Sequence, residues 1–400
     1  MSSVSVNLCQ SYEESDVDKS LSKLFQNLGY PKVNPLSKII SKGDQVFIKP
    51  NWVTHIYRES CKYQDDLYSS ITHPSIIKVL VKYIDQALDG TGKIIIGDNP
   101  SIDANFDILQ EKLGLELLKS QISSEIEIID LRPLWCDNLK YYGIKEKMVE
   151  LPGDPKGHEV INLGKSSFFY GINPKRFRGV FTDRRETIAH HSGEIQEYAI
   201  SKSILDSDVY ISIPKLKSHH KVGATLNLKG LVGTVAIKNY LVHWRQGFPA
   251  IGGDEYPSFF SWFSGLFSSI KKRGAWEGND TCWRMAADLY QIFSEKFKNK
   301  KTFSIIDGIM AGEGNGPFCS KSKKCNLLIG GEDMVATDLV AVRLMNFNYN
   351  QIRYLREFVD SDMNYKIISD LSLLKSDSFF GSNNKFFDFL EPTGWPNLKL

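Results

Sequence analysis

The stretch from Val209 to Gly253 contains no aspartate or glutamate, although the whole chain has 47 acidic and 49 basic residues. Converging lysines hold anions as point charges, and imidazole exchanges protons near neutral pH. The composition therefore predicts a site for a small anionic metabolite, a phosphate or a carboxylate, with His219 as general acid or base. The alternative is a solvated basic face, because exposed lysines are common. The cations and imidazoles of the stretch are Lys215, Lys217, Lys221, Lys229, Lys238, Arg245, His219, His220 and His243.

Glycines separate the apolar residues between these lysines, and they allow backbone to approach a ligand closely. They are Gly223, Gly230 and Gly233. The lysines expected to hold the anion are Lys49, Lys215, Lys217 and Lys229.

The elements that must position these residues alternate between strands and helices. Strands are expected at residues 45–50, 93–97, 126–130, 302–308 and 325–330, and helices at 74–88, 106–118 and 333–345. A helix followed by a strand is expected across 197–214. This order predicts an α/β fold of two lobes with mainly parallel sheets flanked by helices.

Ligands of such sheets bind beyond the carboxyl ends of the strands. Polar residues stand at two of these ends, as Lys49-Pro50-Asn51 and as Gly97-Asp98-Asn99-Pro100. We expect Lys49 and Asn51 to contribute to substrate binding.

Four carboxylates are candidates to bind a hard divalent cation or to position other groups. They are Asp98, Asp307, Glu313 and Asp333. Helix or loop capping is the alternative for Asp98 and Asp333. Asp338, within the predicted helix 333–345, is expected to face inward and to meet the cations of the basic stretch.

Asp307 begins a glycine-rich segment that continues to Pro317. We expect this segment to be a loop that wraps a ligand, with Glu313 at its tip and Asn315 contacting substrate. The alternative is a long mobile loop.

Length favours more than one unit. We expect an N-terminal lobe at 1–150, an irregular connection at 151–200 and a second lobe at 201–400. The net charge of +2 argues against nucleic-acid binding. The N-terminus lacks a secretory apolar region and no membrane-spanning run is present, so a cytoplasmic location is expected. Residues 256–276 are a candidate surface contact, as a membrane-interface helix, a lid or a partner-facing helix.

The six cysteines include no CxxC pair, so no ferredoxin-type iron–sulfur cluster is expected. Cys319 and Cys325 could pair, although reduced thiols are the expectation for a cytoplasmic protein.

Seven motifs in order resemble the domain of unknown function 362 family, over roughly residues 45–350. They are FIKPN, THPSIIKVLVKYI, GDNPS, ISIPKLKSH, TLNLKGLVGT, IIDGIMAGEGNGP and GGEDMVATDLVAVRLM. The chain departs from the family at Gly230, where members often have asparagine, and it lacks the ferredoxin-type cysteines of many members. The family implies no established reaction.

A more distant resemblance is to the nickel-pincer lactate racemases. Thr72-His73-Pro74 stands where they have Thr-Arg-Pro before a helix, and His219, Lys229 and His243 follow the order of their histidines and lysine. The resemblance implies that Lys229 tethers a cofactor, that His219 and His243 bind metal or transfer protons, and that Thr72 and His73 contact substrate. The racemases' Gly-x-His-Arg is Gly97-Asp98-Asn99-Pro100 here, which leaves His190 or His191 as substitutes for the missing histidine.

These observations predict an enzyme that acts on a small anionic metabolite. By analogy, a proton-transfer isomerase or epimerase is the first choice. A metal-assisted hydrolase or transferase acting on a phosphorylated metabolite is the second choice. The third choice is a non-catalytic binding protein. The cofactor is not identified, and a divalent metal is a candidate.

Overall fold

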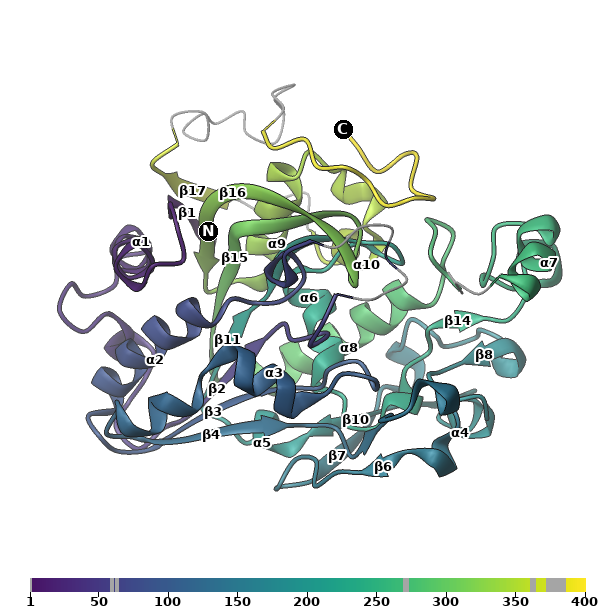
Figure 1. Cartoon of the computed structure of the whole chain (residues 1–400), viewed down its shortest axis with the longest axis horizontal. Helices are drawn as coiled ribbons and strands as arrows, with labels where there is room; N and C mark the ends of the chain where they lie inside the picture. Colours follow the sequence, from purple (N-terminus) through teal and green to yellow (C-terminus); the bar gives the residue numbers. More distant parts are fainter. Residues whose placement is uncertain (1, 58–60, 62–64, 269–272, 360–364, 372–385) are drawn as a thin grey trace.

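The computed structural model describes residues 2–57, 61, 65–268, 273–359, 365–371 and 386–400. A central ten-stranded sheet runs through these residues (Figure 1), with the strand order β17-β1-β16-β15-β11-β2-β3-β4 and with β12 and β13 branching from β15. The pairs from β15 through β11, β2 and β3 to β4 are parallel. The α/β prediction is therefore confirmed.

The strands of this sheet come from both ends of the chain. They are β1 (Ser2–Leu8), β2 (Gln45–Pro50), β3 (Lys93–Asp98), β4 (Glu125–Asp130), β11 (Val209–Ile213), β12 (Lys215–His219), β13 (Gly223–Ala224), β15 (Lys301–Asn315), β16 (Cys319–Gly331) and β17 (Tyr365–Ser369). N-terminal β1 lies between C-terminal β16 and β17. Strands from both predicted lobes thus join one sheet, and the division at residues 150 and 200 stays a prediction.

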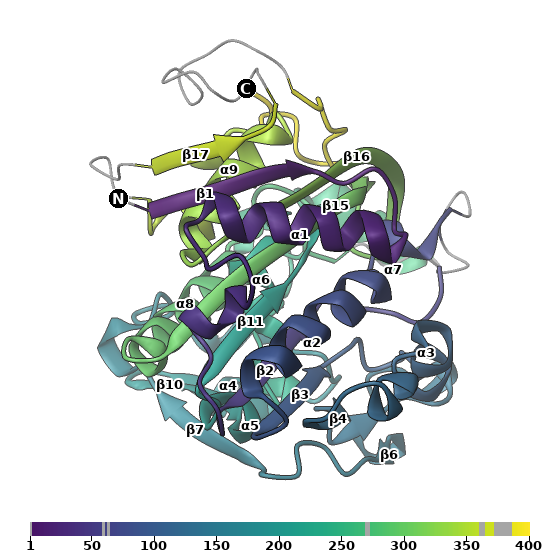
Figure 2. The same cartoon turned by 90° about the vertical axis from the view of Figure 1, so that its left-hand side faces the viewer.

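Both faces of the central strands are buried, because successive side chains alternate between two apolar cores. In β2, Val46 and Ile48 face one core, whereas Phe47 faces the other. Helices α1 (Glu14–Asn27) and α2 (Pro74–Leu88) cover the first face, as Figure 2 shows. Helices α6 (Leu226–Gly230), α8 (Cys282–Phe297) and α9 (Met334–Leu344) cover the second.

The predicted helix at 74–88 is correct because its start is well marked. Pro74 stands in the first turn, where its missing N–H leaves no hydrogen bond unmade, and His73 Nδ1 accepts the backbone N–H of Ser75. The next predicted helix is shorter than expected: α3 (Phe106–Leu113) ends at Gly114, in the left-handed conformation.

Three other expectations for secondary structure were wrong or incomplete. The segment from Thr302 to Asn315 is one continuous strand instead of a strand and a ligand-wrapping loop, and it pairs with β16 along its length. The expected helix after residue 197 is strand β10 (Ile195–Ser201) followed by only one turn, α5 (Lys202–Leu205). The expected 325–330 strand is part of the longer β16.

The segment predicted to be irregular, 131–197, contains several short elements. They are β5 (Leu134–Trp135), β6 (Val149–Glu150), β7 (His158–Asn162), β8 (Phe177–Arg178), α4 (Arg185–Ala189) and β9 (His191–Ser192). Strands β7, β10 and β9 form a small sheet, β5 pairs with β6, and β8 pairs with β14 (Trp244–Arg245).

Two short helices complete the fold, α7 (Phe259–Phe267) and α10 (Arg353–Arg356). Helix α7 lies within the predicted contact segment 256–276, whose Lys271 and Lys272 lie outside the described residues. In the part of the chain that the structure describes, no helix is long and apolar enough to cross a membrane.

Candidate functional site

Four lysines and two histidines of the acid-free stretch gather on the side of the sheet covered by α6 and α8. We call this group the lysine cluster: Lys217, Lys221, Lys229 and Lys238, with His219 and His243. Lys217 and His219 belong to β12, and Lys229 belongs to α6. Each charge in the group alters the pKa of others, which places their functional groups within electrostatic reach of one another.

The ammonium groups of the cluster are withdrawn from water but have no directly bonded carboxylate. Within the described residues, no carboxylate oxygen lies within 4.0 Å of any of the four Nζ atoms. Asp98, Asp254 and Glu255 act on them only as more distant charges. Burial of a cation without a bonded counter-ion is unfavourable, so the cluster is electrostatically suited to an anion.

Lys217 is the most deeply buried member, with none of its surface exposed. Its ammonium donates to the carbonyl of Ser70. Burial lowers the pKa of Lys217 well below its ordinary value, and the charges of Lys215 and Lys229 lower it further.

Lys229 and Lys238 are partly exposed, and their pKa values are lowered toward neutrality. Burial lowers the pKa of Lys229 to about 8, assisted by the charge of Lys221. Burial also lowers the pKa of Lys238 to about 7, assisted by Arg132. Both side chains can therefore exchange a proton near physiological pH.

The two histidines are held as different neutral tautomers. His219 Nδ1 accepts the N–H of Lys221 at 3.1 Å, which leaves the proton on Nε2. His243 Nδ1 lies 3.0 Å from the carbonyl oxygen of Leu241, which can only accept, so Nδ1 carries the proton and Nε2 keeps its lone pair. Burial and nearby lysines lower the pKa of His219 well below its ordinary value and that of His243 to about 3. One ring is thus a proton donor and the other a proton acceptor.

Two buried polar atoms beside the cluster have no hydrogen-bond partner in the structure, Thr225 Oγ1 and Asn99 Oδ1. Thr225 N–H donates to the carbonyl of Lys217, and the Asn99 carbonyl accepts from the Lys238 ammonium. Lys238 also lines a cavity of about 320 Å³ with apolar walls that include Phe181. Unsatisfied buried polar atoms are expected where a ligand or water completes the bonding.

Lys49 and Asp98 lie at strand ends, as the sequence predicts, and their roles in substrate and metal binding stay predictions. They form a buried ion pair with Nζ 2.7 Å from Oδ1. The backbone N–H groups of Trp52 and Asn99 also donate to Asp98. Gly233 covers this pair so closely that a Cβ atom there would lie 2.2 Å from Asp98 Oδ1 and 2.7 Å from Lys49 Nζ. These contacts give Lys49 and Asp98 a positioning role beneath the cluster.

Lys215 is likewise paired. Its ammonium lies 2.8 Å from Asp307 Oδ2 and 2.9 Å from the Tyr12 hydroxyl, with both members of the ion pair fully buried. Tyr12 also donates to Asp307 and stacks on His73, whose backbone N–H donates to Asp307. Lys215 and His73 therefore contribute to a structural network, and burial lowers the pKa of His73 to about 4.

Thr72 connects the ends of β11 and β2, and Asn51 directly follows β2. The Thr72 hydroxyl donates to the carbonyl of Ile213 at 2.6 Å and accepts the N–H of Asn51 at 2.8 Å. Asn51 Oδ1 is buried without a hydrogen-bond partner. Of these two, Asn51 keeps the free polar atom that its predicted substrate role requires.

The four carboxylates predicted to bind a metal do not converge. Asp98 and Asp307 bond lysines, and Asp333 caps α9 by accepting the N–H groups of Val335 and Ala336. Glu313 pairs with Lys323 at 2.8 Å. The described residues include no group of three or more histidines, cysteines or carboxylates that could hold a metal ion.

Glu313 and Asn315 are not in a loop, because β15 continues through both. Glu313 also accepts the N–H of Leu390, and Asn315 Oδ1 accepts the N–H of Thr393. Both side chains thus attach the C-terminal segment to the β15–β16 hairpin. The roles predicted for them were metal binding for Glu313 and substrate contact for Asn315.

Asp338 does face inward, but it does not meet the cations. Its carboxylate accepts backbone N–H groups of Asn227 and Leu228 at 2.9 and 3.0 Å, which satisfies the first turn of α6. Burial raises the pKa of Asp338 to about 7. Its contribution to the site is to hold the helix that carries Lys229.

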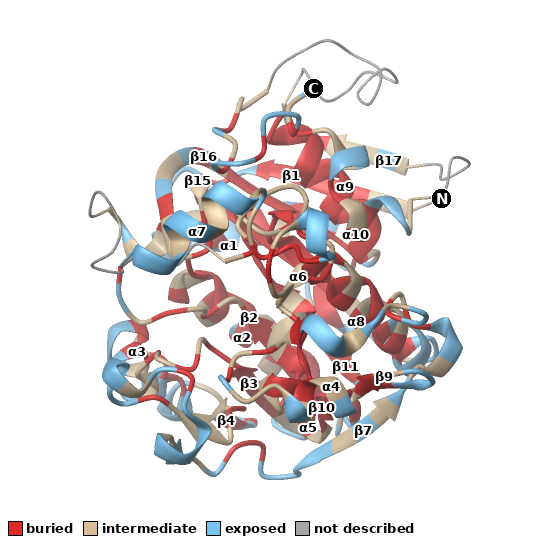
Figure 3. Cartoon of the chain, turned by 90° about the vertical axis from the view of Figure 1, so that its right-hand side faces the viewer, coloured by how far each residue is buried: buried red, intermediate tan, exposed pale blue. Residues whose placement is uncertain are grey.

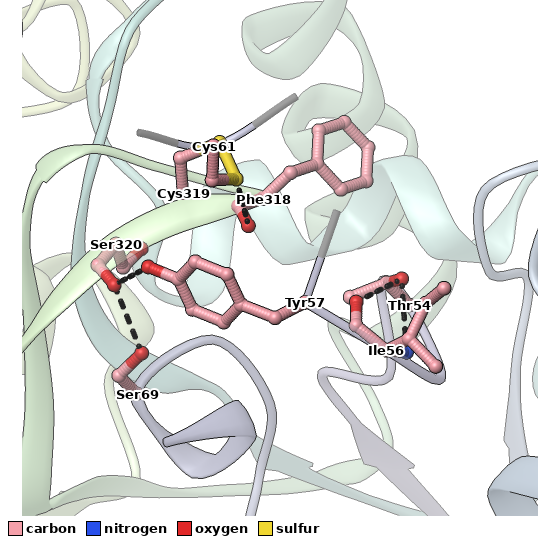
Figure 4. Close-up of a disulfide and its surroundings, with 8 residues drawn as sticks. All are labelled: Thr54, Ile56, Tyr57, Cys61, Ser69, Phe318, Cys319 and Ser320. Atoms are coloured by element: carbon pink, nitrogen blue, oxygen red, sulfur yellow. Dashed lines mark hydrogen bonds between the residues drawn. A yellow bond between two sulfur atoms is a disulfide. The ribbon is translucent and has the colours of Figure 1, made fainter. Parts of the chain in front are cut away.

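The disulfide differs from the expected thiol state and from the candidate pair. Cys61 bonds Cys319 (Figure 4), whereas Cys325 is free and buried. Beside this bond, the Tyr57 hydroxyl and Ser69 Oγ both donate to the carbonyl of Ser320. The loop that ends at Ser70, the partner of Lys217, is thereby attached to β16.

His190 and His191, suggested as substitutes for the missing histidine, form other contacts. His190 bonds Glu197 at 2.6 Å and stacks on Tyr240. His191 is fully buried between Gln196 and the carbonyl of Tyr240. The structure does bring Lys229, His219 and His243 into one cluster, but the described residues include no group of three metal donors there, so the cluster does not by itself form a nickel site.

Members of the site that sequence reasoning did not select are Lys221, Lys238, Thr225, Asn99 and Cys282. The Cys282 thiol donates to the carbonyl of His243 at 3.2 Å. Lys221 lies 4.6 Å from the ring centroid of Trp244. The two lysines were detectable, because they belong to the same acid-free stretch.

Comparison with known proteins supports the first resemblance. Residues 162–343 match the model of a family described as "Domain of unknown function (DUF362)". A thylakoid-associated protein of Synechocystis sp. is 24% identical over 347 residues, which are 86% of this chain and 75% of that protein.

A solved structure, the lactate racemase apoprotein from Thermoanaerobacterium thermosaccharolyticum, is 12% identical with a TM-score of 0.37. The match covers 85% of this chain and spans 56% of the racemase chain. A likeness of this size carries no argument about chemistry.

Proposed function

We propose that the lysine cluster is the active site of an enzyme that moves a proton on a small carboxylate. The observation that carries the proposal is the gathering of four ammonium groups, with that of Lys217 fully buried, without a bonded carboxylate and beside two neutral imidazoles of opposite tautomer. An isomerase or epimerase needs both a group that accepts a proton and one that donates it. Buried cations also stabilise the negative charge that develops when a C–H bond next to a carboxylate is broken.

In this proposal each residue has one task. Lys217 and Lys229 bind the carboxylate, His243 Nε2 accepts the proton, and His219 Nε2–H supplies one. The cavity beside Lys238 accommodates the apolar part of the substrate, and Asn99 Oδ1 and Thr225 Oγ1 supply orienting hydrogen bonds.

The first experiment identifies the anion. Small carboxylates and phosphorylated metabolites are screened by thermal shift, since a compound that binds only the folded state raises its melting temperature. Lys229→Ala should abolish the shift for every compound that stabilises the wild type. If Lys229→Ala keeps the full stabilisation, the cluster is structural and the proposal fails.

The second experiment separates catalysis from binding. Each stabilising compound is incubated with the protein in deuterium oxide. NMR should then show that deuterium replaces hydrogen at one carbon. His243→Ala and His219→Ala should each slow that exchange by about 10²–10⁴ while the thermal shift remains. A thermal shift without exchange would identify a non-catalytic anion-binding protein.

A metal-assisted hydrolase or transferase on a phosphorylated metabolite is the second candidate. It requires a divalent ion, and the dispersed positions of Asp98, Asp307, Glu313 and Asp333 do not favour it. Metal analysis of the purified protein tests it: stoichiometric magnesium, manganese or calcium would support this candidate, and nickel would support racemase-like chemistry.

A cytoplasmic location is our proposal for the compartment, and two observations point away from it. The Cys61–Cys319 disulfide is more typical of an oxidising compartment. The Synechocystis relative is named as thylakoid-associated. Cell fractionation followed by alkylation of free thiols would locate the protein and report its disulfide.

A further inference from the structure

Helix α7 projects from the body of the molecule and buries none of its residues (Figures 1 and 3). Its side chains are nevertheless strongly apolar. Phe260 is 81% exposed and Phe267 is 77% exposed. A contiguous exposed aromatic surface of this kind marks an interaction site.

The helix has an attached side and a free side. On the attached side, Phe259 and Trp262 lie 5.7 and 6.0 Å from the ring of Phe248, measured between centroids. On the free side, residues 260, 263 and 267 follow the spacing of one helical face, with the rings of Phe263 and Phe267 5.3 Å apart. The outward face is therefore an aromatic stripe of Phe260, Phe263 and Phe267.

A basic cleft opens at the foot of this helix. Its volume is about 480 Å³, and it is lined by Asn173, Lys175, Arg176, Arg184, Arg245, Gln246, Ile251 and Gly252. The chain passes from Gln246 to Ile251 through Phe248, the residue that holds α7. Phe248 therefore links the cleft to the helix, and we call the cleft and the aromatic stripe together the docking face.

The cations of the cleft are only partly neutralised. Arg245 pairs with Asp280 at 3.2 Å and with Asp254 at 3.5 Å. Arg176 and Arg184 donate to backbone carbonyls of Gln246 and Lys175, and such carbonyls carry no net charge. Among the described residues, no acidic side chain lines the cleft, and α7 contains no charged residue.

We propose that the docking face binds the surface of an anionic lipid bilayer. Aromatic side chains on a short apolar helix insert at the boundary between head groups and acyl chains. Neighbouring lysine and arginine side chains bind the head-group phosphates and respond to the negative surface potential. The docking face supplies both parts.

Charge favours a bilayer over a second copy of the chain. In a two-fold dimer the same face meets itself, so the basic cleft of one molecule would approach that of the other without an acidic partner. An anionic membrane offers the complementary charge.

The test is co-sedimentation of the full chain with vesicles of phosphatidylcholine alone or with phosphatidylglycerol added. The protein should bind only the anionic vesicles, and added salt should weaken binding. The combined variant Phe260→Ser, Phe263→Ser and Phe267→Ser should bind about tenfold less. Lys175→Glu with Arg184→Glu should also reduce binding.

Matched controls lie on another part of the surface, at Lys32 and Val33, both exposed. Lys32→Glu with Val33→Ser should bind as the wild type does, and unchanged melting temperatures would show that every variant folds. Equal binding to neutral vesicles, or binding by the triple phenylalanine variant at wild-type level, would overturn the proposal. A lipid-free dimer that becomes a monomer in the triple variant would also overturn it, in favour of self-association.

Discussion

Two lysines of one strand, Lys215 and Lys217, are fully buried in opposite circumstances. Lys215 has a carboxylate and a hydroxyl within hydrogen-bond distance, whereas a single carbonyl accepts from Lys217. Removal of one partner from a buried ion pair leaves an uncompensated charge, whereas removal of a cation without a counter-ion relieves a desolvation penalty. Lys217 therefore destabilises the fold, and a destabilising residue of this kind is expected where the protein needs it for function.

Methionine substitutions should therefore have effects of opposite sign. Lys217→Met should raise the free energy of unfolding by about 1–3 kcal/mol, and Lys215→Met should lower it by about 3–5 kcal/mol. Urea unfolding of both variants beside the wild type measures these changes. Equal destabilisation by both substitutions would contradict the distinction drawn between the two lysines.

The lowered pKa values of Lys229 and Lys238 predict a specific pH dependence. Their pKa values are about 8 and about 7 in the folded protein, and the ordinary value is 10.5. Between these values the unfolded chain binds more protons than the folded chain, so the free energy of unfolding should rise with pH in that interval.

Lys229→Met and Lys238→Met should each make the increase in the free energy of unfolding smaller. Between about pH 7 and about pH 10, each should reduce it by about 1–3 kcal/mol. Unfolding of each variant and of the wild type at the two pH values gives the difference. Anion binding should weaken over the same interval, because a neutral amine no longer attracts the ligand. An identical slope in wild type and variants would show that these lysines titrate normally.

At the scale of elements, Gly230 at the end of α6 and Gly233 in the turn that follows differ in their surroundings. A Cβ at Gly233 would collide with the Lys49–Asp98 pair, whereas a Cβ at Gly230 would meet nothing within 4 Å. Gly230 also has helical backbone angles, φ −59° and ψ −28°.

Gly233→Ala should therefore lower the free energy of unfolding by about 1–3 kcal/mol and weaken anion binding, because the pair beneath the cluster must move. Gly230→Ala is the matched control and should be neutral or stabilise by about 0.5–1 kcal/mol. Thermal unfolding and the thermal-shift assay report both effects. Comparable losses in the two variants would show that the close contact at Gly233 has no special consequence.

Sequence patterns predicted elements well where local rules dominate. The α2 span followed from its proline start and apolar periodicity, and the strand ends carrying Lys49 and Asp98 followed from the parallel order. The glycines of β15 were misleading, because glycine usually marks loops. In the fold, a Cβ at Gly312 would lie 2.3 Å from the carbonyl oxygen of Ser69, so this glycine allows close packing within a strand.

The acid-free stretch predicted the cluster but not which lysines remain without a counter-ion. Lys215 and Lys217 look alike in sequence, and the partner of Lys215 is 92 residues away, at Asp307. The same holds for the carboxylates predicted to bind a metal, since the partners of Asp98, Asp333 and Glu313 are determined by the tertiary structure and not by spacing.

At the scale of the whole molecule, one covalent bond joins the loop after β2 to the start of β16. Cys61→Ser should lower the free energy of unfolding by about 2–5 kcal/mol, because the disulfide restricts the unfolded chain. Urea unfolding of the variant and of the wild type, with and without reductant, measures the effect. Reductant should abolish the difference between them, and a wild type that is insensitive to reductant would contradict the prediction.

The same bond makes a closed ring of residues 61 to 319, with a tail at each end. The lysine cluster and the docking face both lie within the ring, so a single protease cut at either place opens the ring without releasing a fragment. The two pieces would migrate together on a non-reducing gel and separate only after the disulfide is reduced. A molecule nicked in this way keeps its polypeptide mass apart from one added water, and the apparent intactness of the protein therefore depends on whether the sample was reduced before it was examined.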